Sequence, residues 1–139
     1  GPVDWSRYAE MEEAIRSRLG DGLRGFAAAA RPVHLVGTAG TVTTLAALDQ
    51  ELRVYDPERV QGYVLERTRI ERLLKRLGEL SVAARATLPC LEPGRADLII
   101  PGTAICLAAM EHFEASAITV SDAGLREGIL IRYLSAAPP

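Results

Sequence analysis

Hydrophobic residues recur at two spacings along this 139-residue chain, and the two spacings predict helices and strands. After Asp4, a candidate N-cap, apolar residues follow at steps of three and four and predict a helix that residues 20–22 end. Its apolar stripe consists of Trp5, Tyr8, Met11, Ile15 and Leu19. Short apolar runs predict strands at 33–36, 63–65 and 117–120, and we expect helices over 41–48 and 125–134.

The sequence pattern in the middle of the chain predicts mainly helices. Asp56 as a cap, with Pro57 at the first helical position, indicates a short helix. Thr68 and Glu71 have the spacing of a capping box, and Ser81 is a candidate cap for a further short helix that ends near residues 88–89. The apolar face behind the capping box consists of Ile70, Leu73, Leu74 and Leu77.

The sequence of residues 95–113 has features of both a strand and a helix. Leu98, Ile99 and Ile100 are typical of a strand, whereas residues 104–113 are typical of a helix. A helix from near Arg95 would need a kink at Pro101, unless it begins late enough to place Pro101 in its first turn. We expect helix for this segment.

Two strand–turn–helix units, near residues 33–48 and 117–134, therefore flank a mostly helical middle. This order predicts an α/β fold with the two strands in parallel and the helices packed on the sheet.

Composition narrows the class of protein. The length suits one domain, and a formal net charge of −2 gives no reason to expect DNA or RNA as a partner. Cys90 and Cys106 lie far apart in apolar surroundings, which favours reduced thiols and a cytoplasmic location. The longest apolar run, 98–110, is interrupted by Pro101 and is too short to span a bilayer, so no membrane partner is expected.

The clearest candidate for chemistry is the turn Gly37-Thr38-Ala39-Gly40-Thr41. Its glycines allow a tight turn and a close ligand, its threonines add hydroxyl groups, and the following helix directs free amides at the loop. This loop could bind a phosphate, or it could be a tight turn without a ligand, and the local pattern favours neither interpretation over the other. No lysine follows Gly40, so the loop is not a Walker A motif.

A second polar turn follows the last strand: Ser121, Asp122, Ala123 and Gly124, with Arg126 and Glu127 in the next helix. Taken alone, Ser121 or Asp122 would cap that helix, and Arg126 and Glu127 would be surface charges.

Other charged residues have two interpretations each. Arg95 and Asp97 could form an ion pair, or Asp97 could cap a helix, in preference to binding a ligand. Arg69, Arg72 and Arg76 would form a solvated helix face, with a polyanion site as the alternative. His34 and His112 lack partners at metal-ligand spacing, so no metal site is expected in this chain.

Three segments together resemble a known family. They are VGTAGTVTTLAALD (36–49), LEPGRADLIIPGTAI (91–105) and ITVSDAGLREGIL (118–130), in this order and spacing. They resemble the exopolyphosphatase / guanosine pentaphosphate phosphohydrolase family. YDPERVQGY (55–63) is similar to the family's intervening stretch, with Gln61 where histidine is expected. The resemblance runs from about residue 31 to 134.

The resemblance implies a fold shared with actin, sugar kinases and heat-shock ATPases, with the active site between two ribonuclease-H-like domains. It implies removal of terminal phosphate from polyphosphate, or hydrolysis of guanosine pentaphosphate, with magnesium. Residues 37–41 would then face phosphate or nucleotide. The residues implied to support the cleft are Arg95, Asp97, Ser121, Asp122, Gly124, Arg126 and Glu127.

The departures from the family are as informative as the match. The Asp-x-Gly-Ser loop, the catalytic glutamate and the Asp-x-Gly-Gly-Gly-Ser-x-Glu loop of the family have no counterpart here. We therefore expect a partial domain: a leading helix within 1–30, then at 31–135 the C-terminal half of an incomplete ribonuclease-H-like domain. Such a fragment would be inactive alone and would self-associate to cover exposed apolar surface. The alternative is a stand-alone phosphate-binding, nucleotide-binding or dimerisation module.

Overall fold

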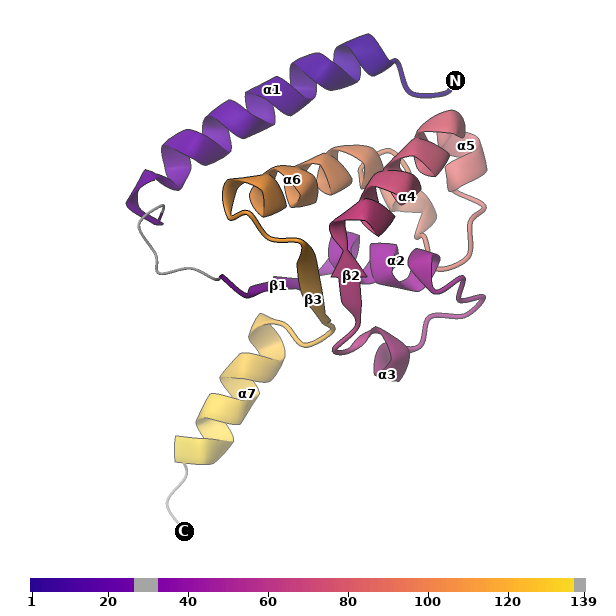
Figure 1. The fold of residues 1–139 in the computed structure, drawn as a ribbon. Helices are drawn as coiled ribbons and strands as arrows, with labels where there is room; N and C mark the ends of the chain where they lie inside the picture. Colours follow the sequence, from indigo (N-terminus) through magenta and orange to yellow (C-terminus); the bar gives the residue numbers. More distant parts are fainter. Residues whose placement is uncertain (27–32, 137–139) are drawn as a thin grey trace.

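Three short strands form a small sheet, with most of the helices grouped on one side of it and the C-terminal helix projecting away (Figure 1). The structure is a computed structural model that describes residues 1–26 and 33–136. Within these residues the elements are α1 (Trp5–Gly22), a 3-10 helix (Arg24–Phe26), β1 (Leu35–Thr38), α2 (Gly40–Asp49), α3 (Pro57–Val60), β2 (Val64–Glu66), α4 (Arg67–Glu79), α5 (Val82–Arg85), a 3-10 helix (Pro93–Arg95), α6 (Ile99–His112), β3 (Ala117–Ser121) and α7 (Leu125–Ala136). The expected boundary between residues 30 and 31 lies outside the described residues.

The sheet has the order β1-β3-β2. β1 and β3 are parallel, with Gly37 opposite Val120 and Thr38 opposite Ser121, whereas β2 is antiparallel to β3. The parallel pair confirms the α/β class. Because the carboxyl ends of parallel strands meet at one edge, the turns after β1 and β3 lie next to each other.

α2 and α4 cover one face of this sheet. α2 contacts β1 and β3, α4 contacts β2, and α6 packs on α2 and α4. The opposite face carries Val36 and Val64, which lie on either side of Thr119 in the strand register and are 61% and 54% exposed. We call this face the bare face of the sheet.

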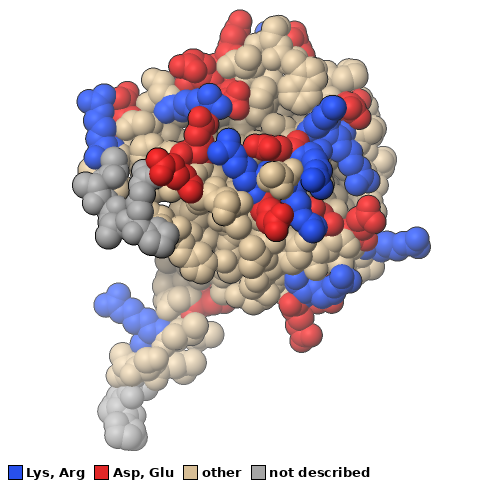
Figure 2. Space-filling view, in the orientation of Figure 1, with Lys and Arg blue, Asp and Glu red and all other residues tan. Residues whose placement is uncertain are grey.

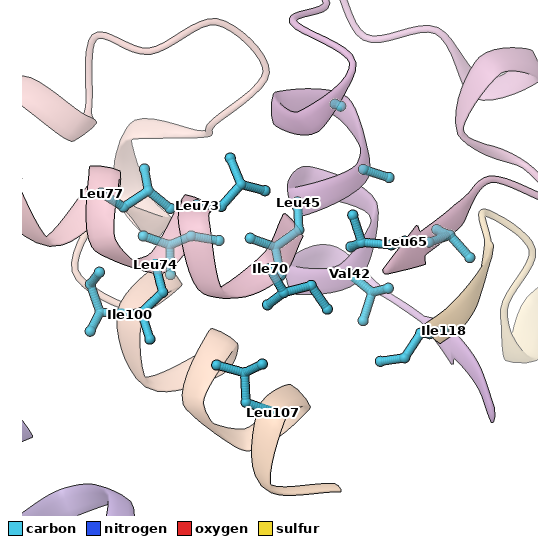
Figure 3. Close-up of a cluster of buried hydrophobic side chains, with 14 of the residues drawn as sticks. Val42, Leu45, Leu65, Ile70, Leu73, Leu74, Leu77, Ile100, Leu107 and Ile118 are labelled. Atoms are coloured by element: carbon cyan, nitrogen blue, oxygen red, sulfur yellow. The ribbon is translucent and has the colours of Figure 1, made fainter. Parts of the chain in front are cut away.

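The core lies between the covered face and the helices. Figure 3 shows Ile70 of α4 pointing toward Leu45 of α2, with Leu65 of β2 beside them. All three side chains have no exposed surface. Leu77, Met110 and Val120 extend this core, since each is at most 2% exposed.

The strands confirm the predicted elements with shifted bounds. The first strand begins at Leu35 and runs to Thr38, two residues later than predicted. Its register with β3 explains the shift, because Gly37 and Thr38 still pair with Val120 and Ser121. The first helix continues through Gly22 instead of ending before Gly20.

Side-chain caps explain the starts of three helices. Asp4 accepts amide hydrogen bonds from Ser6 and Arg7, Asp56 caps α3, and Ser81 caps α5, as predicted. The predicted capping box of Thr68 and Glu71 is wrong. β2 runs directly into α4, so the helix begins at Arg67, and Glu71 pairs instead with the Arg67 side chain (3.0 Å).

Pro101 lies in the first turn of α6, which begins at Ile99. Its missing amide hydrogen therefore removes no helical hydrogen bond, and the helix needs no kink. This confirms the helical prediction for 99–112 and the late start.

The two ends of the described chain pack differently (Figure 1). α1 lies against α6, and Trp5 at its start packs on Gly78 of α4, where an added Cβ would lie 2.5 Å from the ring. α7 buries none of its side chains and projects from the body. No helix among the described residues has the length and apolar content to cross a membrane.

The core assignment predicts a large loss of stability for Ile70→Ala. Removing a fully buried isoleucine side chain leaves a cavity, and we expect the free energy of unfolding to fall by about 2–5 kcal/mol. Urea denaturation followed by circular dichroism measures this change. Ile129→Ala on α7, where the side chain is 60% exposed, is the control and should stay within about 0.5 kcal/mol of the unaltered chain. Equal effects of the two substitutions would contradict the assignment.

Candidate functional site

The turn between β1 and α2 is tight. β1 ends at Thr38 and α2 begins at Gly40, so Ala39 alone joins them. Ala39 has φ 73° and ψ −179°, a backbone conformation found almost only at glycine. The positive φ of this turn falls on Ala39 and on neither glycine.

The two glycines serve close packing instead. A Cβ on Gly37 would lie 2.8 Å from the side chains of Ile118 and Val42, so Gly37 lets α2 approach the sheet. A Cβ on Gly40 would lie 1.4 Å from Nη1 of Arg95. The Arg95 guanidinium therefore rests on the backbone of Gly40, and any larger residue at position 40 would displace it.

The start of α2 is open. Its first helical hydrogen bond runs from the Thr43 amide to the Ala39 carbonyl (3.3 Å), so the amides of residues 40–42 have no acceptor within the helix. No side chain caps this end. The positive end of the helix dipole and the Arg95 cation thus act at the same place, and both favour an anion.

Neighbouring segments position Arg95. Its Nε donates to the Glu92 carboxylate at 3.0 Å. The buried side chain of Arg85 donates to the carbonyls of Leu77, Leu80 and Ala96, which ties the segment around Arg95 to the end of α4. The predicted ion pair of Arg95 with Asp97 is wrong, and Asp97 does not cap α6 either, since Leu98 takes that position without a side-chain bond.

Two hollows meet at Gly40 and Arg95. The larger, about 720 Å³, is polar, and among its lining residues are Ala39, Gly40, Tyr55, Glu92, Arg95, Asp122 and Arg126. The smaller, about 450 Å³, is more apolar and includes Thr38, Thr41, Leu98, Ile105 and Cys106. Thr41 also packs against Gly102 of α6, where an added Cβ would lie 2.5 Å from Thr41 Oγ1.

The turn after β3 lies beside the larger hollow. The Thr38 hydroxyl donates to the Ala123 carbonyl (2.9 Å), as does the Ser121 hydroxyl (3.1 Å). The Asp122 amide donates to Oε1 of Gln61 (2.7 Å), and the Tyr55 hydroxyl donates to the Asp122 carboxylate. The turn after β1 and the turn after β3 are thus joined by Thr38.

Neither Ser121 nor Asp122 caps α7, so that prediction is wrong. The Glu127 carboxylate accepts the Gly124 amide at 2.7 Å instead, because the side chain reaches back over the first turn. This hydrogen bond lowers the pKa of Glu127. Glu127 and Gly124 therefore support the turn, while Arg126 faces the hollow.

The structure gathers Ala39, Gly40, Arg95, Asp122 and Arg126 around one hollow, and leaves Asp97 outside its lining. Sequence reasoning gave no role to Tyr55, Glu92 or Arg85. Tyr55 and Glu92 stood within quoted motifs, but nothing in their spacing indicated that they would meet Asp122 and Arg95. Burial, and then the hydrogen bond to Asp122, raise the pKa of Tyr55 to about 12.

The arginines of α4 form an exposed, mixed-charge face. Arg67 pairs with Glu71 (3.0 Å), Arg69 with Asp49 (3.1 Å), and Arg76 approaches Glu51 (4.0 Å). Figure 2 shows acidic and basic side chains interleaved on this side of the molecule. This agrees with a solvated face and gives little support to a polyanion site there.

Cys90 and Cys106 are free thiols, and burial raises the pKa of Cys106 to about 11. Among the described residues there is no group of three or more histidine, cysteine or acidic side chains that could hold a metal ion.

A parallel strand pair that directs an open helix N-terminus and two arginines into one hollow defines an α/β protein with a candidate anion site. Comparison with known proteins agrees with this class. The family model of the Ppx/GppA phosphatase family matches residues 1–137. The chain therefore belongs to the Ppx/GppA phosphatase family.

Individual relatives are consistent with this assignment. Exopolyphosphatase 2 of Mycobacterium tuberculosis is 32% identical over 94% of this chain. The crystal structure of the Aquifex aeolicus Ppx/GppA family member has 34% identity over 88% of this chain, with a TM-score of 0.77. An exopolyphosphatase from Cytophaga hutchinsonii shares the fold, with a TM-score of 0.79 over 99% of the chain at 24% identity.

The chain spans less than half of each of these relatives. The aligned part is 42% of the M. tuberculosis protein, 40% of the A. aeolicus chain and 44% of the C. hutchinsonii chain.

The backbone of Ala39 generates a stability prediction. Ala39→Gly should raise the free energy of unfolding by about 1 kcal/mol, because glycine adopts this φ and ψ without strain. Ala14→Gly on the exposed side of α1 is the control and should lower it by about 1 kcal/mol. Both are read from urea denaturation; a loss of stability in Ala39→Gly would contradict the strained turn.

Proposed function

We propose that this chain is the phosphate-binding C-terminal part of a phosphohydrolase that acts on inorganic polyphosphate or guanosine pentaphosphate. The observation that carries the proposal is the guanidinium of Arg95 resting on Gly40 at the open start of α2. A terminal phosphate at this point would accept from the free amides of residues 40–42 and from the arginine. Arg126 adds a second positive charge in the same hollow.

The family membership and the names of the relatives support the phosphate as the anion. Glu92 limits the positive charge of the hollow, since it pairs with Arg95 at 3.0 Å. A phosphate carries more charge and more acceptor atoms than this single carboxylate, so it can compete for the guanidinium.

We propose further that this chain does not hydrolyse phosphoanhydrides alone. Hydrolysis needs a group that orients water and a metal ion to neutralise charge. The magnesium ion implied by the resemblance would need carboxylates, and those in the hollow, Glu92 and Asp122, are bonded to Arg95 and Tyr55. The described residues therefore do not fit a magnesium site, and we assign the catalytic groups to the remainder of a parent protein.

We propose that the protein is located in the cytoplasm, which its two free thiols support. The proposal includes neither nucleic acid nor membrane as a partner.

Calorimetric titration with inorganic tripolyphosphate tests the phosphate site. We expect a dissociation constant in the micromolar range, weakened about ten- to hundred-fold by Arg95→Gln, because a charge-assisted hydrogen bond is lost. Gly40→Val should abolish binding by displacing Arg95, with circular dichroism as a check of folding. Arg72→Gln removes the same charge from the exposed face of α4 and is the matched control, expected to bind as the unaltered chain does.

Two results would contradict the site. One is an absence of binding by the unaltered chain at millimolar tripolyphosphate. The other is an Arg72→Gln variant that loses as much affinity as Arg95→Gln, which would move the anion to the face of α4.

A second function, self-association, rests on a separate observation. Large apolar side chains lie exposed on α7 and on the bare face of the sheet: Leu125, Ile129, Leu130, Ile131, Tyr133, Leu134, Val36 and Val64. Patches of this kind mark interaction surfaces. We propose that copies of this chain associate through them.

Light scattering after gel filtration tests this proposal. We expect a mass above the 15.0 kDa of one chain that rises with concentration. The double variant Ile131→Glu and Leu134→Glu should restore the monomer, because charges would be buried on association. A monodisperse monomer of the unaltered chain at about 100 μM, a concentration at which weak interfaces already associate, would contradict it.

A further inference from the structure

One carboxylate, that of Asp122, lines the larger hollow together with two arginines and, among the described residues, pairs with neither. Asp122, Arg95 and Arg126 line the same space. Among the described residues, Arg95 pairs with Glu92, and Asp122 forms no ion pair with either arginine. Its carboxylate accepts from the Tyr55 hydroxyl instead.

Asp122 is held at two points from the same segment of chain. Tyr55 holds the carboxylate, and Gln61 accepts the Asp122 amide at 2.7 Å. The backbone adjoining Gln61 is itself attached to β3, since Gly62 donates to the Val120 carbonyl and Val120 to the Tyr63 carbonyl, each at 2.8 Å. The segment between α2 and β2 therefore acts as a fixed support for this turn.

The Asp122 carboxylate could compete with an anionic ligand for the two arginines. A free carboxylate among two guanidinium groups would form an ion pair and neutralise the charge that an anionic ligand needs. The tyrosine hydroxyl binds one oxygen of the Asp122 carboxylate and so fixes the orientation of this side chain, and within the described residues Asp122 pairs with neither arginine. The hydroxyl is protonated at neutral pH, as in any tyrosine, and burial and the bond to Asp122 raise the pKa of Tyr55 further.

We propose that Tyr55, with Gln61, is a positioning residue of the phosphate site: it holds Asp122 away from Arg126 and Arg95, so that both arginines can meet an anion. Tyr55 acts through Asp122, and its hydroxyl makes no bond of its own to the ligand. This inference rests on the proposed phosphate site and adds a residue to it.

A double-mutant cycle with inorganic tripolyphosphate as the probe tests the inference. Tyr55→Phe removes only the hydroxyl, and we expect calorimetric affinity to fall about three- to ten-fold as Asp122 turns to the arginines. Asp122→Asn removes the competing charge and should bind at least as tightly as the unaltered chain. In the Asp122→Asn background, Tyr55→Phe should then have no effect.

Tyr63→Phe is the matched control. Tyr63 also donates to a carboxylate, that of Asp49 at 2.6 Å, but neither residue lines the hollow. Its removal should leave tripolyphosphate affinity unchanged. Circular dichroism of each variant verifies that the chain is folded.

The outcomes separate this inference from the proposed function. If the unaltered chain binds no tripolyphosphate, both are wrong. If it binds and Tyr55→Phe behaves like Tyr63→Phe, only the positioning role is wrong. If Tyr55→Phe weakens binding equally in the Asp122→Asn background, Tyr55 has a general structural role and the inference is overturned.

Discussion

The parallel pairing of β1 with β3 is the constraint on which the rest of the structure depends. Gly37 opposite Val120 and Thr38 opposite Ser121 fix the register of two segments more than 80 residues apart in the chain. A parallel pair requires a long crossover, and the helices that form it, α2, α4 and α6, supply the core. The same register brings both polar turns to one edge, where Thr38 bonds to Ala123.

Several energetically unfavourable features lie together at that edge of the sheet. Ala39 is held in a backbone conformation that suits glycine, and Arg95 places a cation beside the positive end of α2. Arg126 lines the same hollow and adds a second positive charge. An anion bound at this point would offset the unfavourable charges, which is the physical basis for treating the edge as a ligand site.

Much of this fold could be predicted from the sequence, because its signals are local. The spacing of Ile70, Leu73 and Leu77 predicted α4, the caps Asp4, Asp56 and Ser81 were identified, and Pro101 fell in a first turn. Failures arose at helix starts, where the sequence offers more than one local arrangement. The direct passage from β2 into α4 replaced a capping box, and Glu127 replaced Ser121 and Asp122 as the support of α7.

The candidate site was predictable only in part, because its contacts join segments that are distant in the sequence. The loop 37–41 carries a recognisable pattern, but the contacts that give it charge come from distant segments. Arg95 reaches Gly40 across 55 positions of sequence, and Tyr55 reaches Asp122 across 67, so spacing alone could not pair them. The resemblance named Arg95 and Asp122 as supporting residues without indicating these partners.

Nuclear magnetic resonance titration of the isotopically labelled chain with tripolyphosphate tests the central claim most directly. If a phosphate binds at the open start of α2, the largest amide shifts should fall on residues 40–42, with smaller shifts at 95 and 122–126. Shifts confined to α4, with the amides of residues 40–42 unmoved at saturation, would contradict the account.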